Sequence, residues 1–361
     1  MTQNHPLFQK IEQVRRKPAK VRDTTITLAH GSGGKAMRDL IEDIFVRSFD
    51  NPFLAALEDR ASLDFNSLLA PGDKLAFTTD SYVVTPLVFP GADIGKLAVN
   101  GTINDLAVGG AKPLYLSCGA IIEEGLPVKT LREMAQSMKT AADAAGVQIV
   151  TGDTKVVPRG SADKLFLNTA GIGIIPAGIA VSAGNLQPGD TILINGYLGD
   201  HGAAILSARG ELALETTIES DCQPLHGLVE TIIEVCPEVR AMRDATRGGL
   251  GAVLNEFAIA SEVGIRIEEA ALPIREEVKG MCELLGLEAL YLANEGKLVV
   301  VVPSSRTEAV LGAMRSHPAG TETQVIGEVL PSPPGVVLLQ TGLGSDRIVD
   351  MLVGEQLPRI C

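Results

Sequence analysis

Apolar residues at helical spacing follow the first glycine-rich segment of the chain. The segment consists of His30, Gly31, Ser32, Gly33 and Gly34. The apolar positions after it are three and four residues apart and include Met37, Leu40, Ile41, Ile44 and Phe45. Because this spacing puts side chains on one face of a helix, the pattern predicts a glycine loop that opens directly onto a helix N-terminus.

Strand and helix patterns then alternate along the chain. Residues 74–89 and 165–176 are typical of strands, and a helix that starts at Ile94 is predicted to end at the glycine pair 109–110 before another strand. A second helix, closed by Gly146, leads into a short buried strand. Regular alternation of this kind favours an α/β fold.

The length of 361 residues is enough for two α/β domains, each with its own core. We expect an N-terminal extension over residues 1–25 and a first domain over residues 26–177. A second domain is predicted over residues 178–340, and its strands include the apolar run before Pro303. Residues 341–361 are predicted to be a tail, which begins with a glycine-containing linker.

The composition is that of a glycine-rich α/β enzyme. Apolar residues make up 45% of the chain and charged residues 21%, with 38 glycines, four tyrosines and no tryptophan. The formal net charge is −13, and no basic run is interleaved with aromatic residues, so we expect no nucleic acid partner. The one basic stretch, residues 10–22, is interpreted as a solvated extension.

The sequence indicates neither a membrane span nor a disulfide framework. No apolar run has membrane-spanning length, and the N-terminus lacks the apolar core of a signal peptide. The five cysteines are scattered and form no C-x-x-C pair, which suits a reducing compartment. We therefore expect a cytoplasmic protein that does not bind membranes and whose four interior cysteines pack as small hydrophobic residues.

Carboxylates beside glycine-rich turns are the main candidates for chemistry. The chain has no H-E-x-x-H, G-x-S-x-G or Walker motif, which leaves little support for zinc hydrolysis or Ser-His-Asp acyl transfer. The remaining polar residues, expected near strand ends and helix starts, are Asp80, Asn104, Asp105, Asp153 and Asp244. Since Mg²⁺ prefers carboxylates together with nucleotide phosphates, four aspartates indicate a metal–nucleotide site. Each aspartate alone is better explained by a helix cap or an Asx-turn.

Three further features fit the same kind of site. The loop His30–Gly34 could close over phosphates with its backbone N–H groups, although a flexible turn also explains it. Lys155 lies two residues after Asp153, so on a strand its ammonium group could stabilise charge that develops in phosphoryl transfer. Glu295 precedes a buried strand, where burial could raise its pKa and make it a proton acceptor. A surface ion pair or a turn explains Lys155 and Glu295 equally well.

Eight segments, taken in order, resemble a single protein family. They are HGSGG, FTTDSYVV, GTINDLAV, TGDTKVV, GDHGAAIL, RDATRGGL, ANEGKLV and the final PRIC. Through them the chain resembles the hydrogenase maturation factor family HypE, the carbamoyl dehydratases, from about residue 25 to residue 361. NDLA and DATRGG alone would indicate only the wider PurM-like superfamily, which includes aminoimidazole ribotide synthetase, selenophosphate synthetase and thiamine-monophosphate kinase. The terminal Pro-Arg-Ile-Cys separates the HypE family from these relatives.

The resemblance implies a fold and a reaction. The fold is PurM-like, with an α/β N-terminal domain whose sheet pairs across a homodimer, an α+β C-terminal domain, ATP between the domains and a flexible C-terminal tail. In the reaction, the carbamoyltransferase HypF places a carbamoyl group on Cys361, and the chain uses ATP and Mg²⁺ to dehydrate it to a thiocyanate. The cyano group then passes to iron on the HypC–HypD complex and becomes a ligand of [NiFe]-hydrogenase.

The resemblance also implies roles for the candidate residues. The metal set would be Asp80, Asp105, Asp153 and Asp244. The nucleotide set would be Asp80, Asp105, Asp153, Asn104 and the loop from His30 to Gly34. Lys155 and Glu295 would supply charge stabilisation and proton transfer, and Cys361 would carry the reacting group.

Two other functions fit the same residues. A small-molecule kinase or synthetase of the superfamily would use the same ATP cleft and would not need Cys361. A non-catalytic scaffold would carry a ligand between partners, and the glycine turns would then be purely structural. The eight residues from Gly354 to Cys361 span about 25 Å when extended, and Pro358 disfavours helix there. The thiol could therefore enter a cleft in one state and reach a partner in another.

Overall fold

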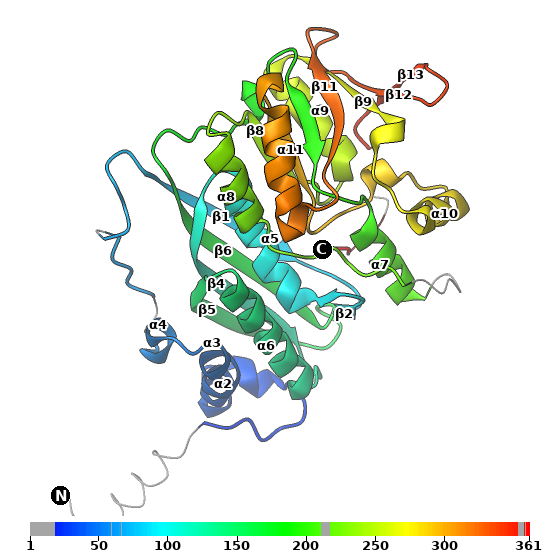
Figure 1. Ribbon diagram of the computed structural model, residues 1–361. Coiled ribbons are helices and arrows are strands. Elements are labelled where there is room, and N and C mark those ends of the chain that lie inside the picture. The colour runs from blue at the N-terminus through cyan, green and yellow to red at the C-terminus, as the bar shows by residue number, and fades with distance from the viewer. Residues whose placement is uncertain (1–18, 59, 66, 211–216, 353–356, 358) are drawn as a thin grey trace, which may run out of the picture.

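The computed structural model describes residues 19–361 except 59, 66, 211–216, 353–356 and 358. Most of the predicted N-terminal extension, and the tail positions from Gly354 to Gln356 with Pro358, therefore lie outside the described residues. The described chain folds into two domains, each built on one main sheet (Figure 1).

The N-terminal domain contains a four-stranded sheet in the order β1-β6-β4-β5. These strands are β1 (Lys74–Tyr82), β6 (Leu165–Ile175), β4 (Lys112–Glu123) and β5 (Gln148–Val157). Only β4 and β5 run parallel, while β6 is antiparallel to both of its neighbours. Two long helices, α5 (Ile94–Val108) and α6 (Val128–Ala144), cover one face of this sheet (Figure 1). The predicted helix that ends at the glycine pair 109–110 is confirmed.

The glycine loop leads into a helical segment, as predicted. This segment lies at the β5 edge of the sheet. The loop contains a 3₁₀ turn (Leu28–Gly31), and Gly34 is the N-cap residue of α2. The helical elements that follow are α2 (Lys35–Leu40), a π-helical turn (Ile41–Val46), α3 (Arg47–Phe49) and α4 (Pro52–Ala55). A small pair, β2 (Val88–Phe89) and β3 (Ala92–Asp93), connects β1 to α5.

The C-terminal domain contains a seven-stranded mixed sheet in the order β13-β12-β9-β11-β7-β10-β8. Its strands are β7 (Thr191–Ile194), β8 (Ala241–Asp244), β9 (Gly264–Glu268), β10 (Leu298–Val302), β11 (Gln324–Leu330), β12 (Val337–Gln340) and β13 (Asp346–Val349). Its helices are α7 (Asp200–Arg209), α8 (His226–Val235), α9 (Gly249–Ser261), α10 (Glu276–Leu285) and α11 (Thr307–Ser316).

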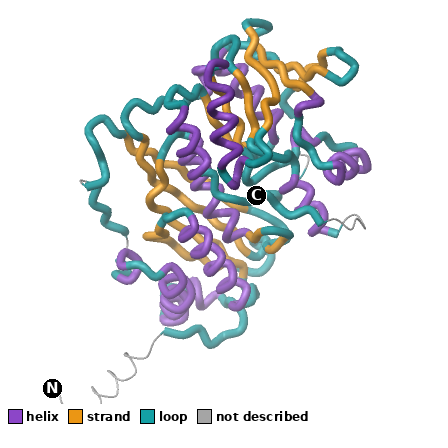
Figure 2. The backbone as a smooth tube through the Cα atoms, viewed as in Figure 1, coloured by secondary structure: helices purple, strands orange, loops and turns teal. Residues whose placement is uncertain are grey.

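Strand β10 shows how this sheet is buried on both faces. All five of its residues are buried. Val299 and Val301 pack in a core with α9, whereas Leu298 and Val300 pack in a core with α8 and α11. The helices therefore cover both sides of the sheet, and Figure 2 shows the resulting layers of helix and strand.

One predicted boundary is wrong. The sequence analysis assigned residues 341–361 to a tail that begins with a linker. In the structure, residues 341–345 are instead the turn of a hairpin, and β13 pairs antiparallel with β12. Val349 is fully buried in the domain core, so the sheet extends to that residue and the tail begins after it.

The four interior cysteines fit the expectation that they pack as small hydrophobic residues. All five cysteines are free thiols, and Cys118, Cys222, Cys236 and Cys282 are buried, as predicted. Within the described residues, no helix is both long enough and apolar enough to cross a lipid bilayer.

Candidate active site at the end of the chain

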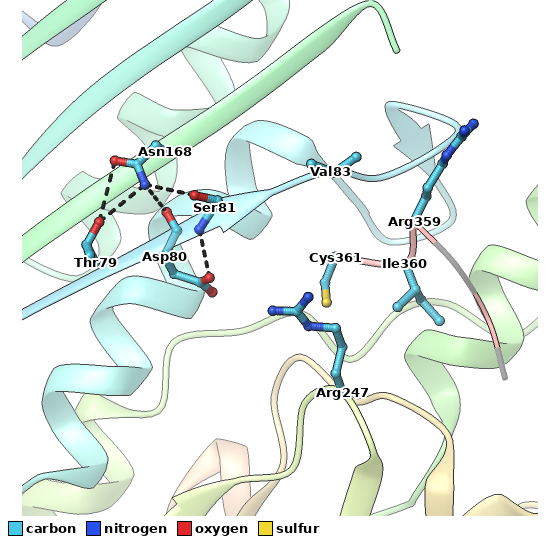
Figure 3. A pocket seen from close by; sticks show the side chains of 9 residues that line it. All are labelled: Thr79, Asp80, Ser81, Val83, Asn168, Arg247, Arg359, Ile360 and Cys361. Carbon is cyan, nitrogen blue, oxygen red and sulfur yellow. Dashed lines mark hydrogen bonds between the residues drawn. The ribbon is translucent and has the colours of Figure 1, made fainter. Parts of the chain in front are cut away.

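The last three residues lie between the two domains (Figure 1). Ile360 forms an isolated antiparallel bridge with Val84, just beyond the end of β1, and is only 4% exposed. A pocket of about 430 Å³ opens beside Cys361. It is lined by Thr79, Asp80, Ser81, Val83, Asn168, Arg247, Arg359, Ile360 and Cys361 (Figure 3). The chain end is therefore part of a pocket wall.

The Cys361 thiol lies near the carboxyl group of Glu295, close enough for each group to influence the pKa of the other. Glu295 is 3% exposed and precedes the buried strand β10, as the sequence predicted. Burial, together with the charges of nearby aspartates, raises the pKa of Glu295 well above its ordinary value. Burial and the charge of Glu295 likewise raise the pKa of the Cys361 thiol. Both groups therefore favour their neutral forms when the tail is docked.

The turn that carries Glu295 is held by Asp221, which the sequence analysis missed. Asp221 Oδ1 accepts a hydrogen bond from Glu295 N at 3.0 Å, and Oδ2 accepts one from Gly296 N at 3.1 Å. Lys297 Nζ lies 3.0 Å from the same Oδ2, and both side chains are buried. A Cβ on Gly296 would lie 2.0 Å from the Asp221 carbonyl oxygen, so glycine is required there. Lys297 is part of the ANEGKLV motif, but nothing in the sequence pattern marks Asp221.

Three of the four predicted aspartates lie near one another, and one of them, Asp80, lines the pocket beside Cys361. Asp80 lies on β1, Asp105 in the last turn of α5, and Asp244 at the end of β8. Burial and the charges of Asp244 and Asp80 raise the pKa of Asp105 to about 7. Burial and the charge of Asp80 also raise the pKa of Asp244 to about 6. We call Asp80, Asp105, Asp244, Glu295 and Cys361 the tail site.

Among the described residues, no group of three or more histidine, cysteine or acidic side chains converges closely enough to hold a metal ion alone. The tail site still fits Mg²⁺ in another way. Mg²⁺ is commonly held by one or two carboxylates together with substrate phosphates and water. Mutual repulsion in the acidic group, seen in the raised pKa of Asp105, would be relieved by a cation.

Asn104 has a different environment from the one predicted. It is 1% exposed, its Oδ1 accepts a hydrogen bond from Leu225 N at 2.7 Å, and its Nδ2 donates to Gln223 O at 3.1 Å. Both ends of the amide are thus used to join α5 to the segment before α8. These contacts give Asn104 a structural role, and we leave it out of the proposed nucleotide site.

The remaining predicted residues lie at the opposite edge of the N-terminal sheet. Asp153 and Lys155 are exposed on β5 and alternate with buried Thr154 and Val156, so their side chains share a face, as predicted. The glycine loop packs against the same strand, since a Cβ on Gly31 would lie 2.8 Å from Val156 N. We call Asp153, Lys155 and the loop from His30 to Gly34 the loop edge. The expectation that every aspartate lies at a strand end or helix start is wrong for Asp153, which is within β5, and for Asp105.

The imidazole ring of His30 is not available to a ligand that binds at the glycine loop. The His30 ring is buried, where Nδ1 accepts a hydrogen bond from Thr27 N at 3.1 Å and Nε2 lies 3.4 Å from Asp23 Oδ2. Ser32, Gly33 and Gly34 are exposed. Ser32 N donates to Ala29 O at 3.4 Å and Gly33 N to Met37 Sδ at 3.3 Å, so the Gly34 N–H is the first candidate for binding phosphate, and the other two would have to exchange these partners for it.

Two polar rows cross the open face of the sheet between the tail site and the loop edge. In one row Ser81 pairs with Asn168, Asn168 with Gly119, and Gly119 with Asp153. The next row is Thr79, Ala170, Ser117 and Thr151. Three strand spacings, roughly 14 Å, therefore separate Ser81 from Asp153. Within one chain the predicted residues form two groups and not one.

Comparison with known proteins identifies the family. Residues 57–175 match the model of the AIR synthase related protein N-terminal domain, and residues 187–340 match the model of its C-terminal domain. The carbamoyl dehydratase HypE of Rhodobacter capsulatus is 57% identical over 341 residues, which cover 94% of this chain and 99% of that protein. The chain belongs to the HypE family of carbamoyl dehydratases.

Solved HypE structures have the same fold. A HypE in complex with ATP superposes with a TM-score of 0.88 at 49% identity, covering 93% of this chain and all of the other. The HypE of a HypE–HypF complex superposes with a TM-score of 0.75 at 49% identity, covering 87% of this chain and 99% of the other. The predicted PurM-like two-domain architecture is confirmed, and so is the predicted family.

A HypE-family residue that the sequence analysis did not select also faces the thiol. Arg247 lines the pocket with its guanidinium group near the Cys361 sulfur (Figure 3). It makes no hydrogen bond or ion pair with any other described residue, and its charge opposes the rise in the pKa of Cys361. Arg247 lies in the motif RDATRGGL, from which the sequence analysis selected only Asp244. Considering the arginine of this motif as well would have identified it as a candidate.

Proposed function

We propose that this chain uses ATP to dehydrate an S-carbamoyl group on Cys361 to a thiocyanate, which supplies cyanide for the iron of [NiFe]-hydrogenase. The observation that carries the proposal is the position of the last residue. Its thiol is docked in a pocket between the domains, near the carboxyl group of the buried Glu295. A thiol that was merely the frayed end of a chain would have no such partner.

The chemistry of the dehydration matches the groups around the sulfur. Conversion of S–C(=O)–NH₂ to S–C≡N removes the carbonyl oxygen and two N–H protons. ATP supplies the phosphoryl group that lets the oxygen leave as phosphate, and Mg²⁺ would offset phosphate charge. Glu295 lies beside the sulfur and can accept an N–H proton, and its raised pKa makes its ionised form a stronger base than an ordinary carboxylate. Arg247 can neutralise negative charge at the departing oxygen.

The proposed nucleotide site uses residues of both the tail site and the loop edge. Asp80, Asp105 and Asp244 would hold the metal near the sulfur, and the exposed N–H groups of the glycine loop would bind phosphates. Lys155 would stabilise negative charge from the loop edge. The polar rows that start at Ser81 and Thr79 provide hydroxyl and amide groups between the two groups. The ATP complex of a 49%-identical HypE supports nucleotide binding in this fold.

We propose a homodimer in which the loop edge of one copy lies close to the tail site of the other. The open face of the sheet carries exposed apolar residues on strands at its edge and centre, with Phe77 at 72% exposed, Leu75 at 54% and Ile121 at 43%. A second copy that packs there would bury this surface, since sheets pack face to face at about 10 Å. Because the groups are roughly 14 Å apart within one sheet, the loop edge of one copy could complete the tail site of the other.

The partners follow from the chemistry. HypF would load the tail, as the solved HypE–HypF complex supports, and the HypC–HypD complex would receive the cyano group. The five free thiols, which include a terminal cysteine that must stay reduced, favour a cytoplasmic location.

Intact-mass spectrometry after incubation with HypF, carbamoyl phosphate and Mg-ATP tests the proposal. We expect the C-terminal peptide to gain one carbamoyl group and then to lose one water only when Mg-ATP is present. The Glu295→Gln variant should stop at the carbamoyl stage, because it cannot accept the proton. Absence of modification on Cys361, or loss of water without ATP, would contradict the proposal. Unchanged ATP turnover on a free substrate by Cys361→Ala would instead favour a small-molecule kinase.

A further inference from the structure

Helix α7 contacts the end of the chain through a buried histidine in its first turn. His201 is fully buried, and its Nε2 lies 2.8 Å from the carbonyl oxygen of Ile360. A carbonyl oxygen can only accept a hydrogen bond, so Nε2 carries the proton and donates it. The histidine thus binds the backbone of the residue immediately before Cys361.

The surroundings of His201 hold the ring in this tautomer. Its Nδ1 lies 2.8 Å from Ser220 Oγ, and Ser220 Oγ also accepts a hydrogen bond from Cys222 N at 3.2 Å. The Ser220 hydroxyl proton is then free to bond with Nδ1. The Phe89 ring packs against the imidazole in a T-shaped arrangement at 5.4 Å. These contacts orient the ring and do not involve the tail.

The last residue of α7 contacts the tail one carbonyl further back. Arg209 Nη2 donates to the carbonyl oxygen of Arg359 at 2.9 Å, and its Nε donates to the carbonyl oxygen of Thr85 at 3.0 Å. Thr85 N donates to the same Arg359 oxygen at 3.2 Å. Arg209 therefore joins the tail to the segment that follows β1.

These contacts do not involve the sulfur. They bind the carbonyl oxygens of residues 359 and 360, and the Ile360 side chain packs in the core of the N-terminal domain. The group on the sulfur can therefore change without loss of any of these hydrogen bonds. A site that holds its substrate by the backbone beside the reacting atom can keep thiol, carbamoyl and thiocyanate forms in the same position.

We infer that His201 and Arg209 are positioning residues that hold the docked tail so that the Cys361 sulfur lies beside Glu295. We call this pair the α7 latch. This inference rests on the proposed function. The docked sulfur faces the interdomain pocket, so loading by a separate enzyme needs a released tail, whereas dehydration needs a docked one. A weaker latch should therefore speed loading and slow dehydration.

The first test measures how fast the Cys361 thiol of the full chain reacts with iodoacetamide, followed by intact mass. The other four cysteines are buried, so Cys361 gives the fast signal. His201→Ala and Arg209→Ala should each raise its rate about tenfold, the effect of losing one strong hydrogen bond. His201→Gln and Arg209→Lys keep a donor and should restore part of the protection. Arg306→Ala, which breaks an exposed ion pair with Glu238, is the matched control and should leave the rate unchanged.

The second test separates a positioning role from a structural one. HypF-dependent carbamoylation and the single-turnover loss of water from preloaded protein are timed separately by mass spectrometry. The latch variants should carbamoylate at least as fast as the unmodified sequence and dehydrate about tenfold more slowly. A parallel fall in both rates would overturn the inference, because it would indicate general damage.

Thermal unfolding checks that each variant is folded. If His201→Ala fails to fold, Arg209→Ala and the tail variant Ile360→Ser still test the inference, since both should expose the thiol. Unchanged alkylation in folded variants would overturn it. If Cys361 is never carbamoylated, the proposed function fails, but the alkylation test still decides whether the latch holds the tail.

Discussion

Cys361 and Glu295 show how environment determines the behaviour of a single residue. Burial raises the pKa of both groups, so the docked pair is neutral and the thiol is a weak nucleophile. Such a thiol is poorly suited to attack a carbamoyl donor while it is docked. In the proposed reaction, carbamoylation of the sulfur would remove the thiol proton and leave Glu295 beside the amide that must lose protons. The same contact would therefore disfavour carbamoylation and favour dehydration.

Asp105 gives a pH-dependent prediction at the residue scale. Its pKa is raised from 3.8 to about 7, so the native state binds a proton that the unfolded state has lost between these values. Stability from this group is present below pH 4 and is lost as the pH rises through 7. Without nucleotide, Asp105→Asn should have a free energy of unfolding higher than that of the unmodified sequence at pH 8, by on the order of 1–3 kcal/mol. At pH 4 the variant should not be more stable.

Urea unfolding at the two pH values checks this prediction. Asp153→Asn, the same change at an exposed position on β5, is the matched control and should show no comparable pH dependence. An equal gain for Asp105→Asn at both pH values would mean that repulsion in the acidic group is not its cause.

At the scale of elements, strand β1 links the tail site to the open face of the sheet. Its residues alternate between the helix-covered face and the open face, where Leu75, Phe77 and Thr79 lie. The strand therefore carries the apolar surface proposed for the dimer and, near its end, Asp80 of the tail site. In the proposed dimer, this arrangement would couple assembly to the geometry of the site.

Replacement of Phe77 by aspartate tests the dimer surface. Phe77→Asp should convert the dimer to monomer, because it places a charge in an interface that would otherwise bury an aromatic ring. Leu284→Asp is the matched control, since Leu284 on α10 is 71% exposed and Phe77 is 72% exposed. Sedimentation analysis should show the shift for Phe77→Asp only. If both variants became monomeric, or if neither did, the result would contradict the open face of the sheet as the dimer surface.

At the scale of the whole molecule, the tail site combines parts from both domains and the chain end. β1 and α5 supply Asp80 and Asp105, the C-terminal domain supplies Asp244 and Glu295, and the last residue supplies the sulfur. The loop edge is roughly 14 Å away on the same sheet. We therefore predict that the loop edge of one copy acts at the tail site of a second copy.

Complementation between two inactive variants tests this prediction. Lys155→Ala retains the thiol and Cys361→Ala retains the lysine, so a mixed dimer has one complete site only if Lys155 acts on the partner's tail. We expect mixing to restore dehydration. Each heterodimer should reach up to about half the activity of the unmodified dimer, because one of its two sites is complete. Mixing Lys155→Ala with the Lys155→Ala, Cys361→Ala double variant is the control and should stay inactive. No recovery with proven exchange of subunits would place Lys155 and Cys361 in one site of one chain.

Much of the fold and the individual site residues could be predicted from the sequence. Apolar spacing predicted the long helices and the buried strand after Glu295, and glycines marked where α5 and α6 end. The residues near turns were found because glycine and aspartate have strong local preferences. Asp221 and His201 were missed, because their roles come from contacts with residues distant in the sequence.

The sequence alone therefore determined which elements form and which family the motifs resemble, and it made the terminal cysteine a candidate site residue. Those properties depend on side-chain spacing and local backbone preference, which act over a few residues. Only the tertiary structure decided that Asp80, Asp105 and Asp244 lie near one another, that Asp153 and Lys155 lie at the opposite sheet edge, and that α7 contacts the last residues of the chain. Strand order and domain packing set these distances, and both result from burial of apolar surface across the whole chain.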